Sequence, residues 1–338
     1  MKFSSHIAQN CRRLKSRQCK NVYNIARSST SYSLRSKQST LSRSLPRGTW
    51  DSHMHVVDPQ NFPLDVDAQY TPHPHTLVDA KAFYSALGIK NMVFVQPSIY
   101  GNDNSCMLEA LKEVGPSRGR AIVGIDPKTT SIETLQEWHG LGVRGARLNF
   151  VSVGRELSEI ELHREIESYV ALLEPLDWVL ELFIPMKQLV ALEKILPSLD
   201  DPFVCIDHFG WPNLPAYDPS RPLDPYSLDG FESLTRLLQR NAWVKLSAPY
   251  RLSKDPEIRD LGVIARELIK DHRERVIYAT DWPHTRFDNI DPVPFIEKCF
   301  EWCADDERRV EKLFRENALE LWGAHVVDED PRPPEKNR

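Results

Sequence analysis

Short apolar segments alternate with segments of helical periodicity through most of the chain. Between residues 47 and 323 this alternation repeats eight times. Several of the apolar segments are apolar almost throughout, as is typical of parallel strands buried on both faces. Eight such units in about 275 residues predict an α/β fold, a (β/α)8 TIM barrel. The predicted strands are residues 50–57, 91–96, 120–125, 143–149, 178–184, 203–207, 242–246 and 276–280.

A doubly wound open sheet is the alternative architecture for the same alternation. Dinucleotide-binding sheets of that kind carry a glycine-rich phosphate loop after the first strand, and no such loop follows any strand predicted here. The closed barrel is therefore the expected fold.

Capping residues mark several of the predicted helices. Thr76 begins the first helix and Gly88 ends it. Ser158 and Glu161 form a capping box for the helix that runs to about residue 173. The segment 209–228 is long and rich in proline, and we expect it to cover another part of the protein. Two helices are expected to close the chain, ending near residue 323.

The charge of the chain is unevenly distributed. Residues 1–47 hold eleven of the 43 basic residues and no acidic residue, so the rest of the chain has 32 basic against 48 acidic residues. An acidic body argues against nucleic acid as the main partner. No apolar run approaches the roughly 20 residues that cross a bilayer, so no membrane-spanning segment is expected. A small molecule is the expected partner.

The first 46 residues have the composition of a targeting segment. They are rich in arginine and serine, and five apolar residues fall on one helical face: Ile7, Cys11, Leu14, Val22 and Ile25. This pattern predicts a mitochondrial transit peptide and a matrix location; a disordered basic tail on a cytoplasmic protein is the alternative. The expected organisation is a targeting segment at 1–46, a barrel at 47–325 and a loose charged tail at 326–338.

Two histidines lie two residues apart in the first predicted strand. His53 and His55 therefore point to the same face of a stiff element, where they could hold a metal ion or direct two donors at a carbonyl oxygen. Packing in the core is the alternative for an isolated pair of this kind. Polar residues also stand at the carboxyl ends of later strands, which is where barrels carry their chemistry. They are Gln96, Ser98, Arg147, Asn149, His208, Ser247 and Asp281.

Six short motifs, in order along the chain, resemble the amidohydrolase superfamily. They are residues 51–55, 95–98, 142–149, 206–208, 245–251 and 280–284, and together they span nearly all of the predicted barrel. The resemblance is nearest to the amidohydrolase-2 branch, which contains 2-pyrone-4,6-dicarboxylate lactonase and sugar-lactone hydrolases. It implies that water opens a lactone ring.

The resemblance also assigns roles to the site residues. Asp281 would deprotonate the attacking water, which requires an ionised carboxylate at neutral pH. The three histidines, His53, His55 and His208, would hold the water and polarise the lactone carbonyl. The alternative for Asp281 is a carboxylate that caps the next turn, and for His208 a histidine satisfied within the core.

No metal is expected to be required. The binuclear members of the superfamily use a lysine on the fourth strand, and residues 143–150 contain none. The mononuclear members usually add a histidine on the fifth strand, where this chain offers only Glu181. The alternative is one divalent cation, zinc, bound by His53, His55, His208 and Asp281.

The substrate is expected to carry fewer charges than a dicarboxylate. Arg147 and Arg251 match positions that contact substrate carboxylates. The resemblance implies two further basic residues in the pyrone dicarboxylate enzyme, one after the fourth strand and one after the sixth. This chain has no basic residue at 151–153, and it has Trp211 at the second position. Arg155 is the candidate substitute for the first. Trp211 and Tyr100 suit a flatter or more apolar ring. The remaining substrate-binding candidates are Gln96, Ser98, Asn149 and Ser247.

Three functions therefore compete at this stage. The first is a lactone hydrolase, and the second is a zinc-dependent decarboxylase that uses the same histidines and Asp281. The third is a catalytically silent barrel that binds a metabolite. A homo-oligomer is compatible with all three.

Overall fold

The computed structural model describes residues 39–287 and 289–324 of the chain. Most of the predicted targeting segment and all of the predicted tail, residues 326–338, lie outside these residues. Residues 39–46, which the sequence placed in that segment, contact the body. The backbone N–H and the hydroxyl of Ser42 donate to Glu297, and the guanidinium of Arg43 lies 4.0 Å from the centre of the Phe300 ring.

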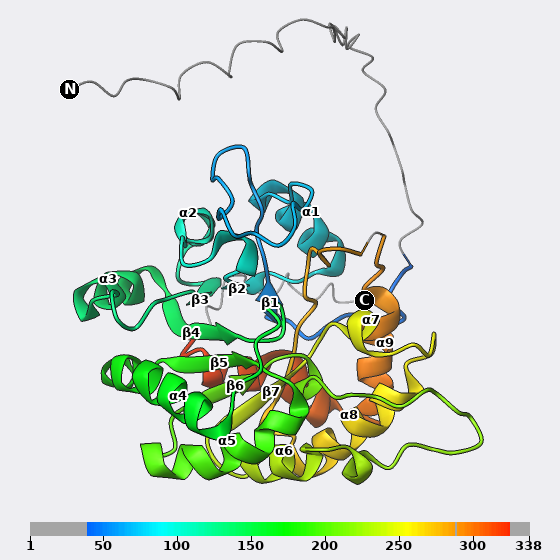
Figure 1. The fold of residues 1–338 in the computed structure, drawn as a ribbon. Coiled ribbons are helices and arrows are strands. Elements are labelled where there is room, and N and C mark those ends of the chain that lie inside the picture. The colour runs from blue at the N-terminus through cyan, green and yellow to red at the C-terminus, as the bar shows by residue number, and fades with distance from the viewer. Residues whose placement is uncertain (1–38, 288, 325–338) are drawn as a thin grey trace, which may run out of the picture. The chain divides into compact units, whose positions relative to one another are not determined.

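Eight strands form one sheet in which every neighbouring pair is parallel and the spatial order equals the sequence order (Figure 1). This arrangement confirms the predicted barrel. The strands are β1 (Trp50–Met54), β2 (Asn91–Val95), β3 (Gly119–Val123), β4 (Val143–Asn149), β5 (Val179–Phe183), β6 (Val204–Ile206), β7 (Ala242–Leu246) and β8 (Val276–Tyr278).

The barrel closes between β1 and the residues that follow β8. Met54 pairs with Trp282 in a parallel bridge. The N–H of His55 donates to the carbonyl of Trp282 at 2.8 Å, and the N–H of Asp281 donates to the carbonyl of His53 at 3.0 Å. Closure therefore places Asp281 beside the two histidines of β1, although more than two hundred residues separate them in the chain.

Helices follow the strands and lie around the outside of the barrel (Figure 1). The predicted caps are present: Thr76 and Asp79 form a capping box on α1, Gly88 ends α1 in the left-handed conformation, and Ser158 and Glu161 form the box on α4. The helices are α1 (Leu77–Leu87), α2 (Ser105–Val114), α3 (Ile132–Leu141), α4 (Glu159–Leu173), α5 (Leu189–Ile195), α6 (Phe231–Leu238), α7 (Pro249–Leu252), α8 (Arg259–His272), α9 (Val293–Trp302), α10 (Glu307–Glu311) and α11 (Asn317–Leu321).

The apolar core has two parts. The larger part fills the space between the strands and the helices, and the smaller part gathers inward-facing side chains such as Val93, Ile122 and Trp243 around Trp322. The indole N–H of Trp322 donates to the hydroxyl of Ser52 at 3.2 Å, and its carbonyl accepts from Nε of Arg120 at 3.0 Å. The end of α11 thus closes the amino-terminal mouth of the barrel, so the opposite mouth is left for a site.

The structure differs from the sequence prediction mainly at element ends. β6 and β8 have three residues each, because the chain turns into the site directly after them. The second of the two expected closing helices is interrupted, since a π-helical turn at Lys312–Glu316 separates α10 from α11. The one-turn helix α7 was not expected. Among the described residues, no helix is both long enough and apolar enough to cross a membrane.

Candidate active site

A layer of buried charged side chains lies inside the barrel, on strands β4 to β7. Nζ of Lys245 contacts the carboxylate of Glu181 and lies 3.2 Å from Oδ1 of Asp207. Arg147 pairs with the same two acids, at 2.8 Å from Asp207 and 3.4 Å from Glu181. The two positive charges balance the two negative ones, which lowers the cost of burying all four.

The sequence analysis did not assign a role to Lys245, Asp207 or Glu181 in the site. The available signal was a charged residue in the middle of an apolar strand. Val-Leu-Glu-Leu-Phe and Ala-Trp-Val-Lys-Leu each contain one, and such a residue is almost never buried without a partner.

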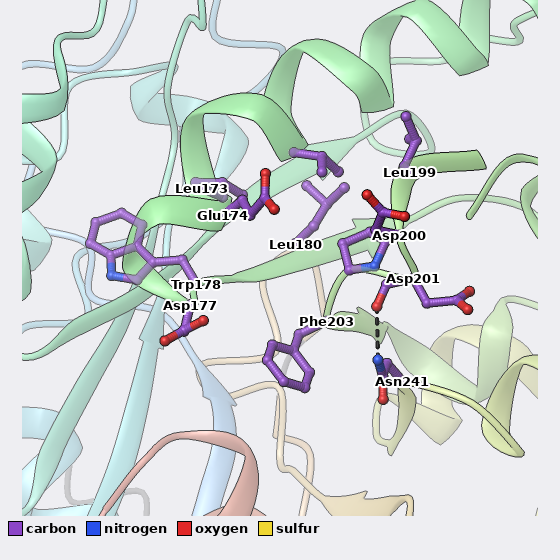
Figure 2. Close-up of a pocket in the computed structure, with 12 residues that line it drawn as sticks. Leu173, Glu174, Asp177, Trp178, Leu180, Leu199, Asp200, Asp201, Phe203 and Asn241 are labelled. Carbon is purple, nitrogen blue, oxygen red and sulfur yellow. Dashed lines mark hydrogen bonds between the residues drawn. The ribbon is translucent and has the colours of Figure 1, made fainter. Parts of the chain in front are cut away.

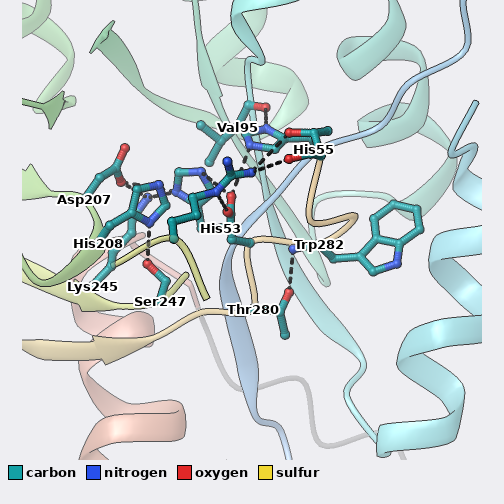
Figure 3. A network of polar contacts seen from close by, with 12 residues as sticks. His53, His55, Val95, Asp207, His208, Lys245, Ser247, Thr280 and Trp282 are labelled. Carbon is teal, nitrogen blue, oxygen red and sulfur yellow. Dashed lines mark hydrogen bonds and ion pairs between the residues drawn. The ribbon is translucent and has the colours of Figure 1, made fainter. Parts of the chain in front are cut away.

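Three histidines lie next to this layer (Figure 3). The ring of His53 is 4.9 Å from those of His55 and His208, measured between ring centres. Nδ1 of His53 faces Nζ of Lys245 at 3.0 Å, and its Nε2 is buried with no hydrogen-bond partner among residues 39–287 and 289–324. Nδ1 of His55 donates to the carbonyl of Val95 at 2.7 Å, and Nδ1 of His208 lies 2.7 Å from the hydroxyl of Ser247. Each ring is therefore held through Nδ1, which leaves Nε2 for the site.

Asp281 completes the cluster, and its two oxygens differ in their surroundings. Oδ2 accepts from Nε of Arg251 at 2.9 Å and from the hydroxyl of Tyr250. Oδ1 lies 3.5 Å from Nε2 of His55 and 3.7 Å from Nε2 of His53. The four side chains that the sequence analysis expected at one mouth of the barrel do lie together there, and Oδ1 is the oxygen that faces the histidines.

A buried carboxylate behind the site fixes the two segments that carry it. Asp51 accepts hydrogen bonds from the backbone N–H groups of His53 (3.0 Å) and Thr280 (2.9 Å), and from the hydroxyls of Tyr84 (2.6 Å) and Thr280. The hydroxyl of Thr280 in turn accepts from the N–H of Trp282 at 3.0 Å (Figure 3). Asp51 thus ties β1 to the segment after β8, which sets the distance between His53 and Asp281.

Three residues just beyond β6, β7 and β8 have left-handed backbone conformations. The φ angles are 51° at His208, 53° at Ala248 and 62° at Asp281. For a residue with a Cβ this conformation costs roughly 1–2 kcal/mol, and such residues often occur at functional sites. The strained turns direct the side chains of His208 and Asp281 into the barrel mouth.

Burial and neighbouring charges set the protonation states. Burial lowers the pKa of His208 to about 4 and lowers that of His53 well below its usual 6.5. Burial is the largest influence on Asp281 and would raise its pKa, but Arg251 and the three neighbouring histidines together hold the pKa well below the usual 3.8. For Lys245 burial again opposes the charge, yet the carboxylates of Asp207 and Glu181 raise its pKa. At neutral pH the site therefore presents an ionised carboxylate at Asp281, neutral imidazoles at His53 and His208, and a buried ammonium at Lys245.

The donor atoms suit a divalent cation by type and spacing. Ligand atoms of His53, His55 and Asp281 lie within 4.8 Å of one another, and so do those of His53, Asp207 and His208. Imidazole and carboxylate are the ligands of catalytic zinc. The first group has a free Nε2 on each ring and Oδ1 of Asp281 facing both.

The predicted substrate-binding residues fall into two groups. Arg251 contacts the Asp281 carboxylate and Ser247 contacts His208, as described above. The others make internal contacts. Gln96 donates to the carbonyls of Gly101 (3.1 Å) and Asp103 (2.8 Å), and the hydroxyl of Tyr100 accepts from the N–H of Asp58 at 2.9 Å.

Similar internal contacts occupy the remaining candidates. Asn149 accepts from the N–H of Ser152 at 2.9 Å, and Ser98 begins a short 3-10 turn. Arg147 is committed to Asp207, and Arg155 lies on the surface 3.4 Å from Glu165. These contacts shape the loops and the floor of the site, and a direct role of these residues in substrate binding stays a prediction.

A separate cavity of about 210 Å³ lies between the amino-terminal ends of β5, β6 and β7 (Figure 2). Trp178, Phe203 and Asn241, which stand at or just before these strand ends, line it. It contains none of the residues expected in the site. It lies at the end of the strands opposite to the histidines, and we assign it no role.

The fold and the site define a (β/α)8 barrel whose carboxyl-terminal mouth carries a histidine–aspartate cluster. The amidohydrolase family model matches residues 50–324, so the chain belongs to that family, as the motifs predicted. It is 31% identical over 288 residues to a 4-sulfomuconolactone hydrolase of Hydrogenophaga intermedia, covering 82% of this chain and 90% of that protein. It is 29% identical over 295 residues to a 2-pyrone-4,6-dicarboxylate hydrolase of Comamonas testosteroni, covering 84% and 92%. Among solved structures, a 2-pyrone-4,6-dicarboxylic acid hydrolase of Pseudomonas putida, itself described as putative, superposes with a TM-score of 0.67 at 27% identity, covering 84% of this chain and all of that one.

Proposed function

We propose that this protein hydrolyses a small lactone, with Asp281 as the general base. The observation that carries the proposal is the asymmetry of the Asp281 carboxylate. Arg251 and Tyr250 hold Oδ2, whereas Oδ1 faces the Nε2 atoms of His53 and His55. The relatives named for the hydrolysis of 4-sulfomuconolactone and 2-pyrone-4,6-dicarboxylate support the same reaction class.

The reaction follows from this arrangement. Oδ1 of Asp281 takes a proton from water as the water oxygen adds to the lactone carbonyl carbon. The electron pair of the C=O bond moves to the carbonyl oxygen, where hydrogen-bond donors stabilise the negative charge. When this pair returns, the bond to the ring oxygen breaks, and Asp281 returns the proton to the departing oxygen. The product is an open-chain hydroxy acid, or its enol or keto form, and the base is regenerated.

The charges in the site favour a substrate with few anionic groups. Arg147 lies against Asp207, and Arg251 against Asp281, so both guanidinium groups already have a carboxylate partner. A dicarboxylate would have to be desolvated with little compensation. Trp211 stands where a further basic residue would hold it, with its ring 4.8 Å from that of Phe183 in an edge-to-face contact. We therefore propose a lactone with an apolar or aromatic-derived ring and at most one carboxylate.

A divalent cation is the alternative way to use the same cluster. His53, His55 and Asp281 would hold it, with His208 nearby, and the cation would polarise a carbonyl group. This arrangement supports the second candidate function, a zinc-dependent decarboxylase.

One experiment separates these functions. The purified chain is freed of metal by chelation and assayed on a panel of lactones by proton release at constant pH, with evolved carbon dioxide measured in parallel. We expect ring opening that survives chelation. Activity that requires stoichiometric zinc, with release of carbon dioxide from a carboxylic acid, would favour the decarboxylase. No turnover of any lactone would refute the proposal.

We also propose that residues 1–46 direct the protein to the mitochondrial matrix, on the composition of the segment alone. Fusion of these residues to a fluorescent protein tests this directly. Diffuse cytoplasmic fluorescence would refute it.

A further inference from the structure

We propose that Lys245 fixes the tautomer of His53, so that the proton of this imidazole is on Nε2 and points into the site. The tautomer itself follows from contacts inside the barrel. Its use as a hydrogen-bond donor to the lactone carbonyl rests on the proposed function.

The donors and acceptors around Lys245 decide which nitrogen of His53 is protonated. A lysine ammonium has three N–H donors and no acceptor. Nζ of Lys245 hydrogen-bonds to the Glu181 carboxylate and to Nδ1 of His53 at 3.0 Å, and it forms an ion pair with Oδ1 of Asp207 at 3.2 Å. The lysine side chain is fully buried, so water does not replace any of them. Two hydrogen bonds and one ion pair thus hold the ammonium.

The hydrogen bond between Lys245 and His53 determines where the proton of His53 lies. Because an ammonium can only donate, Nδ1 of His53 must accept and cannot carry a hydrogen. The single proton of a neutral imidazole is then on Nε2. The opposite tautomer would direct Nδ1–H at Oδ1 of Asp207, 3.2 Å away, but it would place that N–H against the ammonium and leave one lysine donor buried without an acceptor.

His55 has the opposite tautomer. Its Nδ1 lies 2.7 Å from the carbonyl oxygen of Val95, which can only accept, so in the neutral ring Nδ1 carries the hydrogen and Nε2 carries a lone pair. The two rings that face Oδ1 of Asp281 therefore differ. His53 offers a donor to the carbonyl oxygen, whereas His55 and Asp281 offer two acceptors, which orient a water molecule through both of its hydrogens.

The protonation of His53 on Nε2 also affects whether the site can bind a metal ion. A metal ion binds the lone pair of an imidazole nitrogen, and Nε2 of His53 has none while it is protonated. Although the spacing of His53, His55 and Asp281 suits a cation, Lys245 keeps the first of these ligands in the wrong form. The ammonium therefore favours the reaction without metal.

The direct test is the tautomer of His53 in the full chain. Long-range ¹H–¹⁵N correlation NMR on protein labelled with ¹⁵N-histidine distinguishes Nδ1–H from Nε2–H, and the spectrum of His53→Gln assigns the signal. We expect Nε2–H for His53 and Nδ1–H for His55. An Nδ1–H signal for His53 would overturn the inference. This result does not depend on lactone turnover, so a failure here is distinct from a failure of the proposed function.

A second test changes the tautomer. The double variant Lys245→Met with Glu181→Gln removes one charge of each sign, which keeps the buried layer neutral. We expect His53 to take the Nδ1–H form, with Asp207 as acceptor, and the affinity for zinc by calorimetry to rise about 10-fold to 100-fold.

The matched control is Lys270→Met with Glu267→Gln, the same changes in a pair 3.8 Å apart on the surface of α8, with zinc affinity expected to stay unchanged. An unaltered His53 signal and unaltered zinc affinity in a folded Lys245 variant would refute the role of the lysine. If that variant does not fold, the NMR spectrum of the unaltered protein still shows which nitrogen of His53 carries the hydrogen.

Discussion

Replacement of Asp281 by asparagine is the sharpest test of the proposed chemistry. The change keeps the size of the side chain but removes its charge and its ability to accept a proton at neutral pH. A general base contributes roughly 10²–10⁴-fold to a rate, so kcat should fall by that factor, which corresponds to about 3–5 kcal/mol in the activation barrier. Substrate affinity, measured by calorimetry on the inactive variant, should change far less, because Oδ1 acts on the water and not on the bound ring.

The same replacement has a structural cost that the contacts allow us to assess. Arg251 loses the charge of its partner at 2.9 Å, but it keeps two bonds to Thr285 and its side chain is 13% exposed. A hydrogen bond between charged groups contributes about 1.5–3 kcal/mol, so we expect the free energy of unfolding to fall by about 1–3 kcal/mol. The variant should remain folded at assay temperature.

Asp255→Asn is the matched control. Asp255 is buried and accepts from an arginine in the same way, since Nε and Nη2 of Arg259 lie 2.7 and 2.8 Å from its oxygens. We expect a comparable loss of stability by urea unfolding, with kcat unchanged. Proton-release rates on the best lactone of the panel compare the two variants. If Asp281→Asn retains kcat within tenfold of the unaltered protein, or if Asp255→Asn loses as much, the assignment of Asp281 as the base is wrong.

Three further changes test the fold and the substrate assignment. Burial lowers the pKa of His284 to about 4, against 6.5 when the chain is unfolded. Between these pH values the unfolded chain takes up a proton that the folded chain does not. The free energy of unfolding therefore falls by roughly 3 kcal/mol as pH falls from 6.5 to 4. His284→Gln should therefore lose less stability than the unaltered protein between these pH values in chemical denaturation, and equal slopes would contradict the burial argument. In Gly145→Ala the added methyl would lie 2.2 Å from the carbonyl oxygen of Val179, so β4 and β5 must separate. The free energy of unfolding should then fall by about 1–3 kcal/mol or more. A variant of unchanged stability would show that the strands can adjust. Trp211→Arg should improve the KM for dicarboxylated lactones relative to uncharged ones, and an unchanged ratio would remove the charge-based substrate argument.

Much of the architecture could be predicted from the sequence, because it depends on local patterns. The eight apolar segments became eight strands in the same order, and the caps at Thr76, Gly88 and Ser158 lie where expected. The meeting of the histidines with Asp281 was also predictable, since the carboxyl ends of all strands in a parallel barrel share one mouth. That rule predicts that these residues are close in space, although they are far apart in the sequence.

The roles of single polar residues were decided only by the tertiary structure. Arg147 was expected to contact substrate, but it lies against Asp207, sixty positions later in the chain. Gln96 directly follows β2 as predicted, and Tyr100 lies in the 3-10 turn after it; both side chains form hydrogen bonds with neighbouring loops. The position of a residue at a strand end predicts which mouth of the barrel its side chain faces. It does not predict which neighbouring group that side chain contacts.

The protonated forms of the histidines depend on contacts of the same long range. Lys245 is 192 residues from His53, and Val95 is 40 residues from His55, yet these two partners decide which nitrogen of each ring carries the hydrogen. The sequence by itself predicted the barrel and the meeting of the three histidines with Asp281. Only the folded barrel, by bringing an ammonium to one ring and a carbonyl to the other, decided which ring donates and which accepts.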